Sequence, residues 1–305
     1  MSRFDAVVVG AGPNGLAAGV ELTRSGRRVL VLEGSDAIGG GTRTEALTLA
    51  GFRHDVCSAI HPLGIASPFF TAAGIGDWVQ PDIPVTQPLD GGRAAVLYRS
   101  LVETVANLGA DGDRYRRLIG GLVDHIDDLV AQVLGPVPIP PPHPITLGRF
   151  GVPGLLPASV MARGLGTEAG RALHAGMAAH AIAPFGTPLT GALSTLFAAI
   201  AHAYGWPLVR GGSQRLAEEM AELIIDGGGA VETGRTVTSV GDLPEAPITL
   251  LDVMPQAAVR IGNRRLDPGM RRRFARWRSG PGVFKVDWAL DGPIPWADGM
   301  SGRAG

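Results

Sequence analysis

Three glycines and one glutamate near the start of the chain have the types and spacing needed to hold a dinucleotide. Gly10, Gly12 and Gly15 occupy the G-x-G-x-x-G positions of the segment GAGPNG, and Glu33 follows 18 residues after Gly15. In this pattern the glycines allow a tight turn, a close approach of a pyrophosphate to the backbone, and close packing of a helix on a strand. The pyrophosphate rests on the N-terminus of that helix, and the acidic side chain accepts hydrogen bonds from a ribose hydroxyl. An acid at this position disfavours the 2′-phosphate of NADP.

The residues around these four predict a strand–helix–strand unit that would position them. Ala6–Val9 is a short β-branched run of the kind found in buried parallel strands. Apolar residues then recur near helical spacing from Leu16 to Leu22, and a second apolar run, Val29–Leu32, leads directly to Glu33. A structural turn without a nucleotide is the alternative interpretation. Because strand, helix, second strand and acid all occur in register, the sequence favours the dinucleotide.

A second glycine-rich segment begins shortly after Glu33 and ends at Arg43, ten residues beyond that glutamate. An NAD-binding domain has no particular need for a glycine-rich turn there. With both segments present, the sequence resembles the superfamily of FAD-dependent amine oxidases and phytoene desaturases, and most closely its phytoene desaturase-related branch. The N-terminal signature of that superfamily is a G-x-G-x-x-G unit, an acidic strand end and a GG-R/T turn, which is matched here by Gly39, Gly40, Thr42 and Arg43. The resemblance continues in GFRHDVCSAIHPL (51–63), RGGSQRLAEEMAELI (210–224) and GPGVFKVDWALDGPIPW (280–296).

This resemblance implies an α/β fold in which a Rossmann-like FAD-binding domain is interrupted by a largely helical domain. Residues 1–75 and 205–252 would form the discontinuous FAD-binding domain, and residues 76–204 and 253–305 the substrate (cap) domain. The implied cofactor is FAD. Val237 is implied to support the adenine or its ribose through main-chain contact. The predicted cofactor-binding residues are Gly10, Gly12, Pro13, Asn14, Gly15, Glu33, Gly34, Gly40, Gly41, Thr42, Arg43 and Val237.

One stretch tests whether the chain is a soluble protein. Residues 172–209 contain no Asp, Glu, Lys or Arg, and Leu189–Trp206 approaches the length of a membrane span. Histidine, proline and glycine interrupt this stretch, so it predicts a buried helix pair. Peripheral contact with a membrane surface stays open as an alternative. The resemblance implies that these helices wall an apolar cavity over the flavin.

Composition and charge exclude several classes of partner and site. The chain has 305 residues and a net charge of −1, so no broad basic surface for nucleic acid is expected. The single cysteine, Cys57, rules out an internal disulfide, a CxxC redox pair and a cysteine-cluster metal site, and no metal is predicted. The residues before the first strand lack the pattern of a signal peptide, which predicts a cytoplasmic protein. The oligomeric state is not indicated.

No catalytic acid, base or nucleophile is evident. The seven histidines form no H-E-x-x-H motif and the serines no G-x-S-x-G motif, so the catalytic residues stay unassigned. Because a flavin accepts hydride at its own ring, this absence suits a flavoenzyme. His61 and His180 are weak candidates to line its pocket. The predicted function is an FAD-dependent oxidoreductase that removes hydride from an apolar small molecule. A less favoured alternative is an ordinary NAD-linked enzyme.

The sequence departs from the resembled family in its final part. Family members carry a later glycine-rich stretch that contacts the flavin ring and ribityl chain, and nothing from Pro255 onward matches it. We therefore expect a chain truncated at its C-terminus, with an incomplete site around the flavin ring. The alternative function is accordingly a catalytically inactive nucleotide-binding fragment of such an enzyme.

Overall fold

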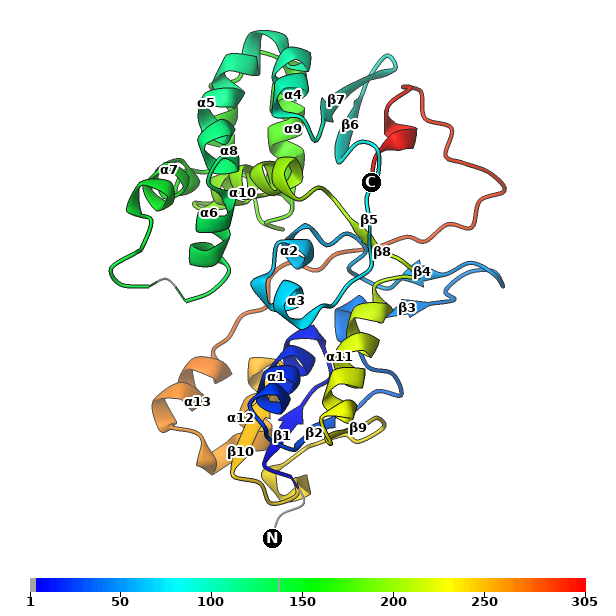
Figure 1. The fold of residues 1–305 in the computed structure, drawn as a ribbon, viewed down its shortest axis with the longest axis vertical. Helices are drawn as coiled ribbons and strands as arrows, with labels where there is room; N and C mark the ends of the chain where they lie inside the picture. The colour runs from blue at the N-terminus through cyan, green and yellow to red at the C-terminus, as the bar shows by residue number, and fades with distance from the viewer. Residues whose placement is uncertain (1–3, 137) are drawn as a thin grey trace.

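The computed structural model describes residues 4–136 and 138–305 and places a sheet region and a helical region at opposite ends of the molecule (Figure 1). The strands are β1 (Ala6–Val9), β2 (Val29–Leu32), β3 (Thr44–Glu45), β4 (His54–Asp55), β5 (Trp78–Val79), β6 (Val85–Leu89), β7 (Arg93–Leu97), β8 (Leu208–Val209), β9 (Ala230–Glu232) and β10 (Ile248–Leu251). The α-helices are α1 (Pro13–Arg24), α2 (Pro62–Ile65), α3 (Pro68–Ala73), α4 (Leu101–Asn107), α5 (Gly112–Val123), α6 (Ile126–Val133), α7 (Pro144–Gly154), α8 (Ala158–Ala162), α9 (Glu168–Ala179), α10 (Thr190–Ala203), α11 (Gln214–Asp226), α12 (Pro255–Gly262) and α13 (Pro268–Ala275). Short 3₁₀ turns include η1 (Gly40–Thr42).

The sheet region is built on four parallel strands in the order β10-β1-β2-β9. β1 and β2 are buried along their whole length, which is why their sequences AVVV and VLVL are continuously apolar rather than alternating. The helix α1 connects these two strands, as expected for a parallel crossover. The predicted strand–helix–strand unit and the α/β class are therefore confirmed.

Helices cover both faces of this sheet. On one face α1 and α11 pack on Ala6 and Val8, with Leu16 and Met220 fully buried between the layers. On the other face Val7 and Val9 pack with Ile261 of α12. Successive residues of β1 therefore support opposite layers, as the pleat of a strand requires. The division of the chain into two discontinuous domains stays a prediction.

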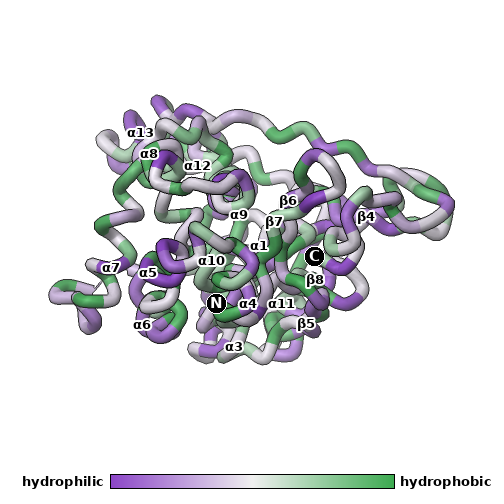
Figure 2. The backbone as a smooth tube through the Cα atoms, turned by 90° about the horizontal axis from the view of Figure 1, so that it is seen from above, coloured by the Kyte–Doolittle hydropathy of each residue, from purple (hydrophilic) through white to green (hydrophobic). Residues whose placement is uncertain are grey.

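The helical region comprises α4 to α10 and has its own core. Figure 2 shows both hydrophobic and hydrophilic residues along these helices. The buried residues of this core include Leu129, Leu173, Met177 and Ile200. The predicted buried helix pair corresponds to α9 and α10, which pack against each other. No helix among the described residues is long and apolar enough to cross a membrane.

Two local expectations differ from the structure. Apolar residues at helical spacing between residues 100 and 134, interrupted at Gly109–Asp113, predict two helices joined by a turn. The structure instead has three, α4, α5 and α6, because the chain turns again at Asp124 and His125. The sequence also predicts a strand over residues 231–240, but the strand in the structure, β9, ends at Glu232. Gly234 then adopts a positive φ of 66° and donates its N–H to the Ser35 carbonyl, which takes the chain out of the sheet.

A buried histidine in the helical region makes stability depend on pH. His202 of α10 is 5% exposed, accepts a hydrogen bond at Nε2 from the Tyr115 hydroxyl (2.8 Å) and donates from Nδ1 to the Arg99 carbonyl (3.2 Å). Burial lowers the pKa of His202 from 6.5 to about 4, although hydrogen bonds to the backbone oppose this shift. The folded protein therefore holds this ring neutral, whereas the unfolded chain protonates it at higher pH.

We expect the free energy of unfolding to fall by up to about 3 kcal/mol as the pH falls from about 6.5 towards 4, because the folded-state pKa is the lower one. Urea titrations at several pH values measure this dependence. His202→Gln should flatten it, whereas replacement of the exposed His125 by glutamine should leave it unchanged. An unchanged pH dependence in His202→Gln would contradict the assignment.

Candidate functional site

The two glycine-rich segments predicted from the sequence meet at the carboxyl edge of the parallel sheet. The Gly39 N–H donates to the Ala11 carbonyl (2.8 Å), and a Cβ added at Gly40 would lie 3.2 Å from the Cα of Gly12. Gly10 follows β1 with a φ of 103° and donates its N–H to the Leu32 carbonyl at the end of β2 (2.8 Å). Ligands of open α/β sheets bind outside this edge.

The backbone at this edge offers hydrogen-bond donors to an anion. Helix α1 starts at Pro13, which has no N–H, and its first turn carries the positive end of the helix dipole. Among the described residues, no group accepts a hydrogen bond from the N–H of Gly12, Asn14, Gly40 or Gly41. Unused donors at a helix N-terminus beside a close-packed glycine turn fit a pyrophosphate.

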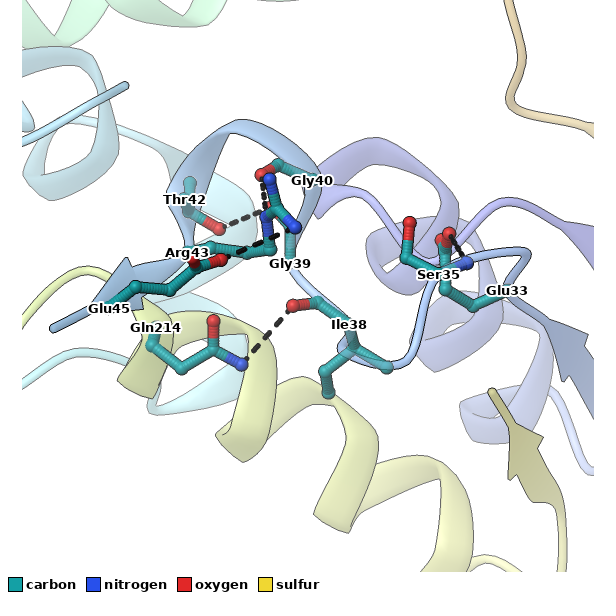
Figure 3. Close-up of polar contacts among 9 residues, drawn as sticks. All are labelled: Glu33, Ser35, Ile38, Gly39, Gly40, Thr42, Arg43, Glu45 and Gln214. Carbon is teal, nitrogen blue, oxygen red and sulfur yellow. Dashed lines mark hydrogen bonds and ion pairs between the residues drawn. The ribbon is translucent and has the colours of Figure 1, made fainter. Parts of the chain in front are cut away.

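Glu33 is held in place by the same loop. Its Oε2 accepts from the Ala11 N–H (2.8 Å), and its Oε1 accepts from the Ser35 N–H (2.9 Å), the second of which is drawn in Figure 3. Each carboxylate oxygen has more than one acceptor site, so both retain capacity for a hydroxyl donor. The loop thus orients the predicted ribose acceptor before any ligand arrives.

The side chains of the second glycine turn mainly hold its shape (Figure 3). Thr42 Oγ1 donates to the Gly39 carbonyl (2.8 Å), and Arg43 Nε donates to the Gly40 carbonyl (3.1 Å). The Arg43 guanidinium also pairs with Glu45 (3.3 Å), and both side chains are partly exposed. An exposed pair of this kind contributes little stability, so Arg43 can exchange Glu45 for a phosphate at small cost.

Gly34 directly follows Glu33, and the segment that contains Val237 runs beside these two residues. The Arg235 N–H donates to the Glu33 carbonyl (2.7 Å), and a Cβ at Gly34 would touch Thr236. Val237 packs on the sheet face that contains Leu30 and Leu32. The structure therefore brings the predicted cofactor-binding residues of the two glycine segments and Glu33 to one edge of the sheet, whereas Val237 packs on a face of the sheet. Their contact with a cofactor stays a prediction.

Asp252 belongs to this edge, although the sequence reasoning did not assign it to the site. It directly follows β10, and its Oδ2 accepts from the Gly15 N–H in the first turn of α1 (2.7 Å). The signal was present in the sequence, since ITLLD places an acid after an apolar run as VLVLE does at Glu33. The sequence alone does not show that β10 pairs with β1, and it is this pairing that brings Asp252 to the site.

A polar network leads from the second glycine turn towards the helical region. The Ser58 N–H donates to the Gly41 carbonyl (2.9 Å), and the Ser213 hydroxyl donates to the Ser58 carbonyl (2.7 Å). The same hydroxyl lies 2.7 Å from His61 Nε2, and the Ser213 N–H donates to Asp55 (2.8 Å). The segment containing residues 55–61 thus connects the glycine turn to a small cavity.

This cavity has a volume of about 160 Å³. It is lined by both histidines that the sequence predicted to line a pocket, His61 and His180. Phe197 and Trp206 complete an aromatic wall, with the His180 ring 5.0 Å from the Phe197 ring and 5.5 Å from the Trp206 ring. Burial lowers the pKa of both histidines, and for His61 the Asp55 carboxylate partly opposes this effect. Both rings are therefore neutral near pH 7, and the cavity is aromatic and uncharged.

Comparison with known proteins agrees with this geometry. Residues 8–70 match the family model of the NAD(P)-binding Rossmann-like domain. One component of the limonene dehydrogenase of Castellaniella defragrans is 31% identical over 126 residues, which are 39% of this chain and 23% of that protein. A putative flavin-containing monoamine oxidase of Mycobacterium tuberculosis is 62% identical over 40 residues, which are 13% of this chain and 9% of that protein.

Solved structures share the fold over most of the chain. A Pyrococcus furiosus protein superposes with a TM-score of 0.59 at 18% identity, covering 90% of this chain and 65% of its own. A triple mutant of putrescine oxidase superposes with a TM-score of 0.55 at 20% identity, covering 89% of this chain and 63% of its own. The chain thus spans less than two thirds of the length of each of these proteins. The chain therefore contains an NAD(P)-binding Rossmann-like domain, and its overall fold is similar to that of these solved structures, one of which is a putrescine oxidase.

Proposed function

We propose that this chain binds FAD at the carboxyl edge of its parallel sheet and belongs to an oxidoreductase acting on an apolar small molecule. The observation that carries the proposal is the joint surface of the two glycine segments, with four unused backbone N–H groups beside the oriented carboxylate of Glu33. The N–H groups of Gly12, Asn14, Gly40 and Gly41 would hold the pyrophosphate, and Glu33 would hold the ribose. A cytoplasmic location forms part of this proposal.

When bound, FAD would accept a hydride at its ring, and the chain would bind the cofactor and exclude water from the substrate. The small cavity supports an apolar substrate because its wall consists of Phe197, Trp206, neutral histidines and aliphatic residues, with no charged side chain among the described residues that line it. Limonene, named for one relative, is an apolar molecule, whereas the amines named for others are polar. His61 and His180 would line the substrate site as neutral rings, since burial lowers the pKa of both.

We expect FAD to raise the melting temperature of the purified chain and NADP to leave it unchanged, because Glu33 repels a 2′-phosphate. NAD serves as the comparison that carries no 2′-phosphate. Thermal melts with each dinucleotide, together with the flavin absorbance of the protein as purified, measure this preference. Stabilisation by NADP alone would overturn the proposal.

Asp252 tests where the pyrophosphate sits. Asp252→Asn keeps an acceptor for the Gly15 N–H but removes a negative charge beside the proposed phosphates. We expect FAD binding to tighten by on the order of fivefold, about 1 kcal/mol. Titration of FAD at low salt measures the change, and Asp226→Asn at the exposed end of α11 is the control. Weaker binding in Asp252→Asn would instead identify the charge itself as useful to the cofactor.

The second candidate is a module that binds the nucleotide without turnover. It is favoured by a run of apolar side chains that lie exposed after α13, including Phe284 (93% exposed) and Trp288 (71%). Such side chains normally pack against other protein. Turnover with an artificial electron acceptor distinguishes the two candidates: FAD binding without turnover of apolar alkenes or alcohols supports the module, and turnover excludes it.

A further inference from the structure

A larger cavity lies inside the helical region, and nothing in the proposed flavin site uses it. It measures about 480 Å³, within the range of about 300–1,000 Å³ typical of small-molecule sites. Helices α5, α7, α8, α9 and α10 contribute to its lining, which is mainly apolar and includes Leu118, Ile119, Pro153, Leu173, Met177 and Ala198. Figure 1 shows these helices together at the end of the molecule opposite the parallel sheet.

The cavity is distinct from the small aromatic cavity described above. Its lining residues all lie between positions 108 and 198, so neither the glycine segments nor α2 contributes to it. The α9–α10 pair borders both cavities but through different residues. Met177 and Ala198 line the larger one, whereas His180, which follows α9, and Phe197 line the smaller one. The α9–α10 pair thus lies between the larger and the smaller cavity.

The polar groups inside the larger cavity are already satisfied by the protein. His174 Nε2 donates to the Ala158 carbonyl (3.1 Å), and its Nδ1 lies 2.6 Å from the Ser194 hydroxyl. Burial lowers the pKa of His174, so the ring is neutral. The Asp111 carboxylate accepts from the Gly166 N–H and from both the N–H and the hydroxyl of Thr167. Away from Asp111, Arg114 and Arg117 the lining carries no charged side chain, so that part of the interior suits a hydrocarbon.

Two arginines at the edge of the cavity provide unpaired positive charge. Arg114 and Arg117 both line it, both are exposed, and they lie three residues apart on α5, on the same side of the helix. Throughout residues 4–136 and 138–305, no carboxylate forms an ion pair with either guanidinium. The Arg114 guanidinium lies against Gly164, beyond α8, which places it over the loop between α8 and α9. Guanidinium groups bind carboxylates in planar, bidentate geometry.

We propose that this cavity binds an apolar carboxylate, with its carboxylate at Arg114 and Arg117 and its hydrocarbon tail between α5, α9 and α10. A neutral hydrocarbon would gain nothing from the two guanidiniums, and a cation would be repelled by them. The Asp111 carboxylate also borders the cavity, but its oxygens are engaged by the residue 166–167 backbone and Thr167. The site does not depend on the proposed FAD site.

Isothermal titration with decanoate, below its micelle concentration, tests the proposal on the full chain, and decan-1-ol and decyltrimethylammonium serve as comparison ligands. We expect decanoate to bind once per chain and the cation not to bind. The double variant Arg114→Gln/Arg117→Gln should weaken decanoate by about tenfold or more and leave decan-1-ol unchanged. Arg116→Gln is the matched control, because Arg116 lies on the same helix but does not line this cavity.

Ala198→Phe fills the cavity and should abolish binding of both decanoate and decan-1-ol. If this buried substitution prevents folding, the surface arginine variants still decide the question. Absence of decanoate binding, or equal weakening by Arg116→Gln and by the double variant, would overturn the proposal. Titrations with and without FAD separate the two sites, since a failure to bind FAD would leave the decanoate result unaffected.

Discussion

Gly12→Val is expected to weaken FAD binding by about 100-fold, or about 3 kcal/mol, without unfolding the protein. The valine side chain would stand where the phosphates approach and would block the N–H groups of Gly12 and Asn14, and hydrogen bonds to charged groups contribute about 1.5–3 kcal/mol each. The fold should tolerate the change because Gly12 has ordinary extended angles (φ −69°, ψ 171°). Within the described part of the chain, the neighbour that a Cβ there would meet is Asp252 Oδ2, at 3.3 Å.

Fluorescence titration of FAD into the variant measures this loss. Gly148→Val is the matched control, since a Cβ at Gly148 in α7 meets no atom of the described residues within 4 Å and lies far along the chain from the glycine segments. A circular dichroism spectrum and a melting temperature like those of the parent chain confirm folding. If Gly12→Val bound FAD as tightly as the parent chain, the pyrophosphate could not lie at the start of α1.

Gly10→Ala is expected to lower the free energy of unfolding by about 4 kcal/mol or more, because it disrupts the end of β1 itself. Gly10 has a φ of 103°, a conformation that residues with a Cβ rarely adopt. An added Cβ would also collide with the backbone carbonyl oxygen of Asp252, directly after β10, which cannot move without disturbing the sheet. Two neighbouring glycines of one motif thus serve different purposes.

Urea denaturation followed by circular dichroism measures the loss in Gly10→Ala, and failure to obtain soluble protein would agree with it. Gly148→Ala is the control, since alanine in an open helix position is neutral or stabilising. A stability equal to that of the parent chain would show that the strand end can rearrange, and the close packing of Gly10 on the end of β10 would then be unimportant.

Local sequence alone determined the core of the proposed nucleotide-binding edge. The runs AVVV and VLVL, the glycines between them and Glu33 lie within 28 residues of one another, so strand propensity, turn chemistry and helical spacing specify their arrangement directly. The second glycine turn was also recognisable, since its residues are adjacent in sequence. Its contact with the first turn, through Gly39 and Ala11, again joins residues that are close along the chain.

Only the tertiary structure decided the features that join distant segments. Asp252 reaches Gly15 across 237 residues because β10 pairs with β1, and Ser213 reaches His61 across 152 residues. The large cavity likewise depends on how five helices pack. Hydrophobic periodicity specifies which face of each element is buried but not which element it meets, because many partners offer similar apolar surface. Strand order and helix packing settle that choice, and with it the position of Asp252 beside Gly15 and of the two arginines beside the large cavity.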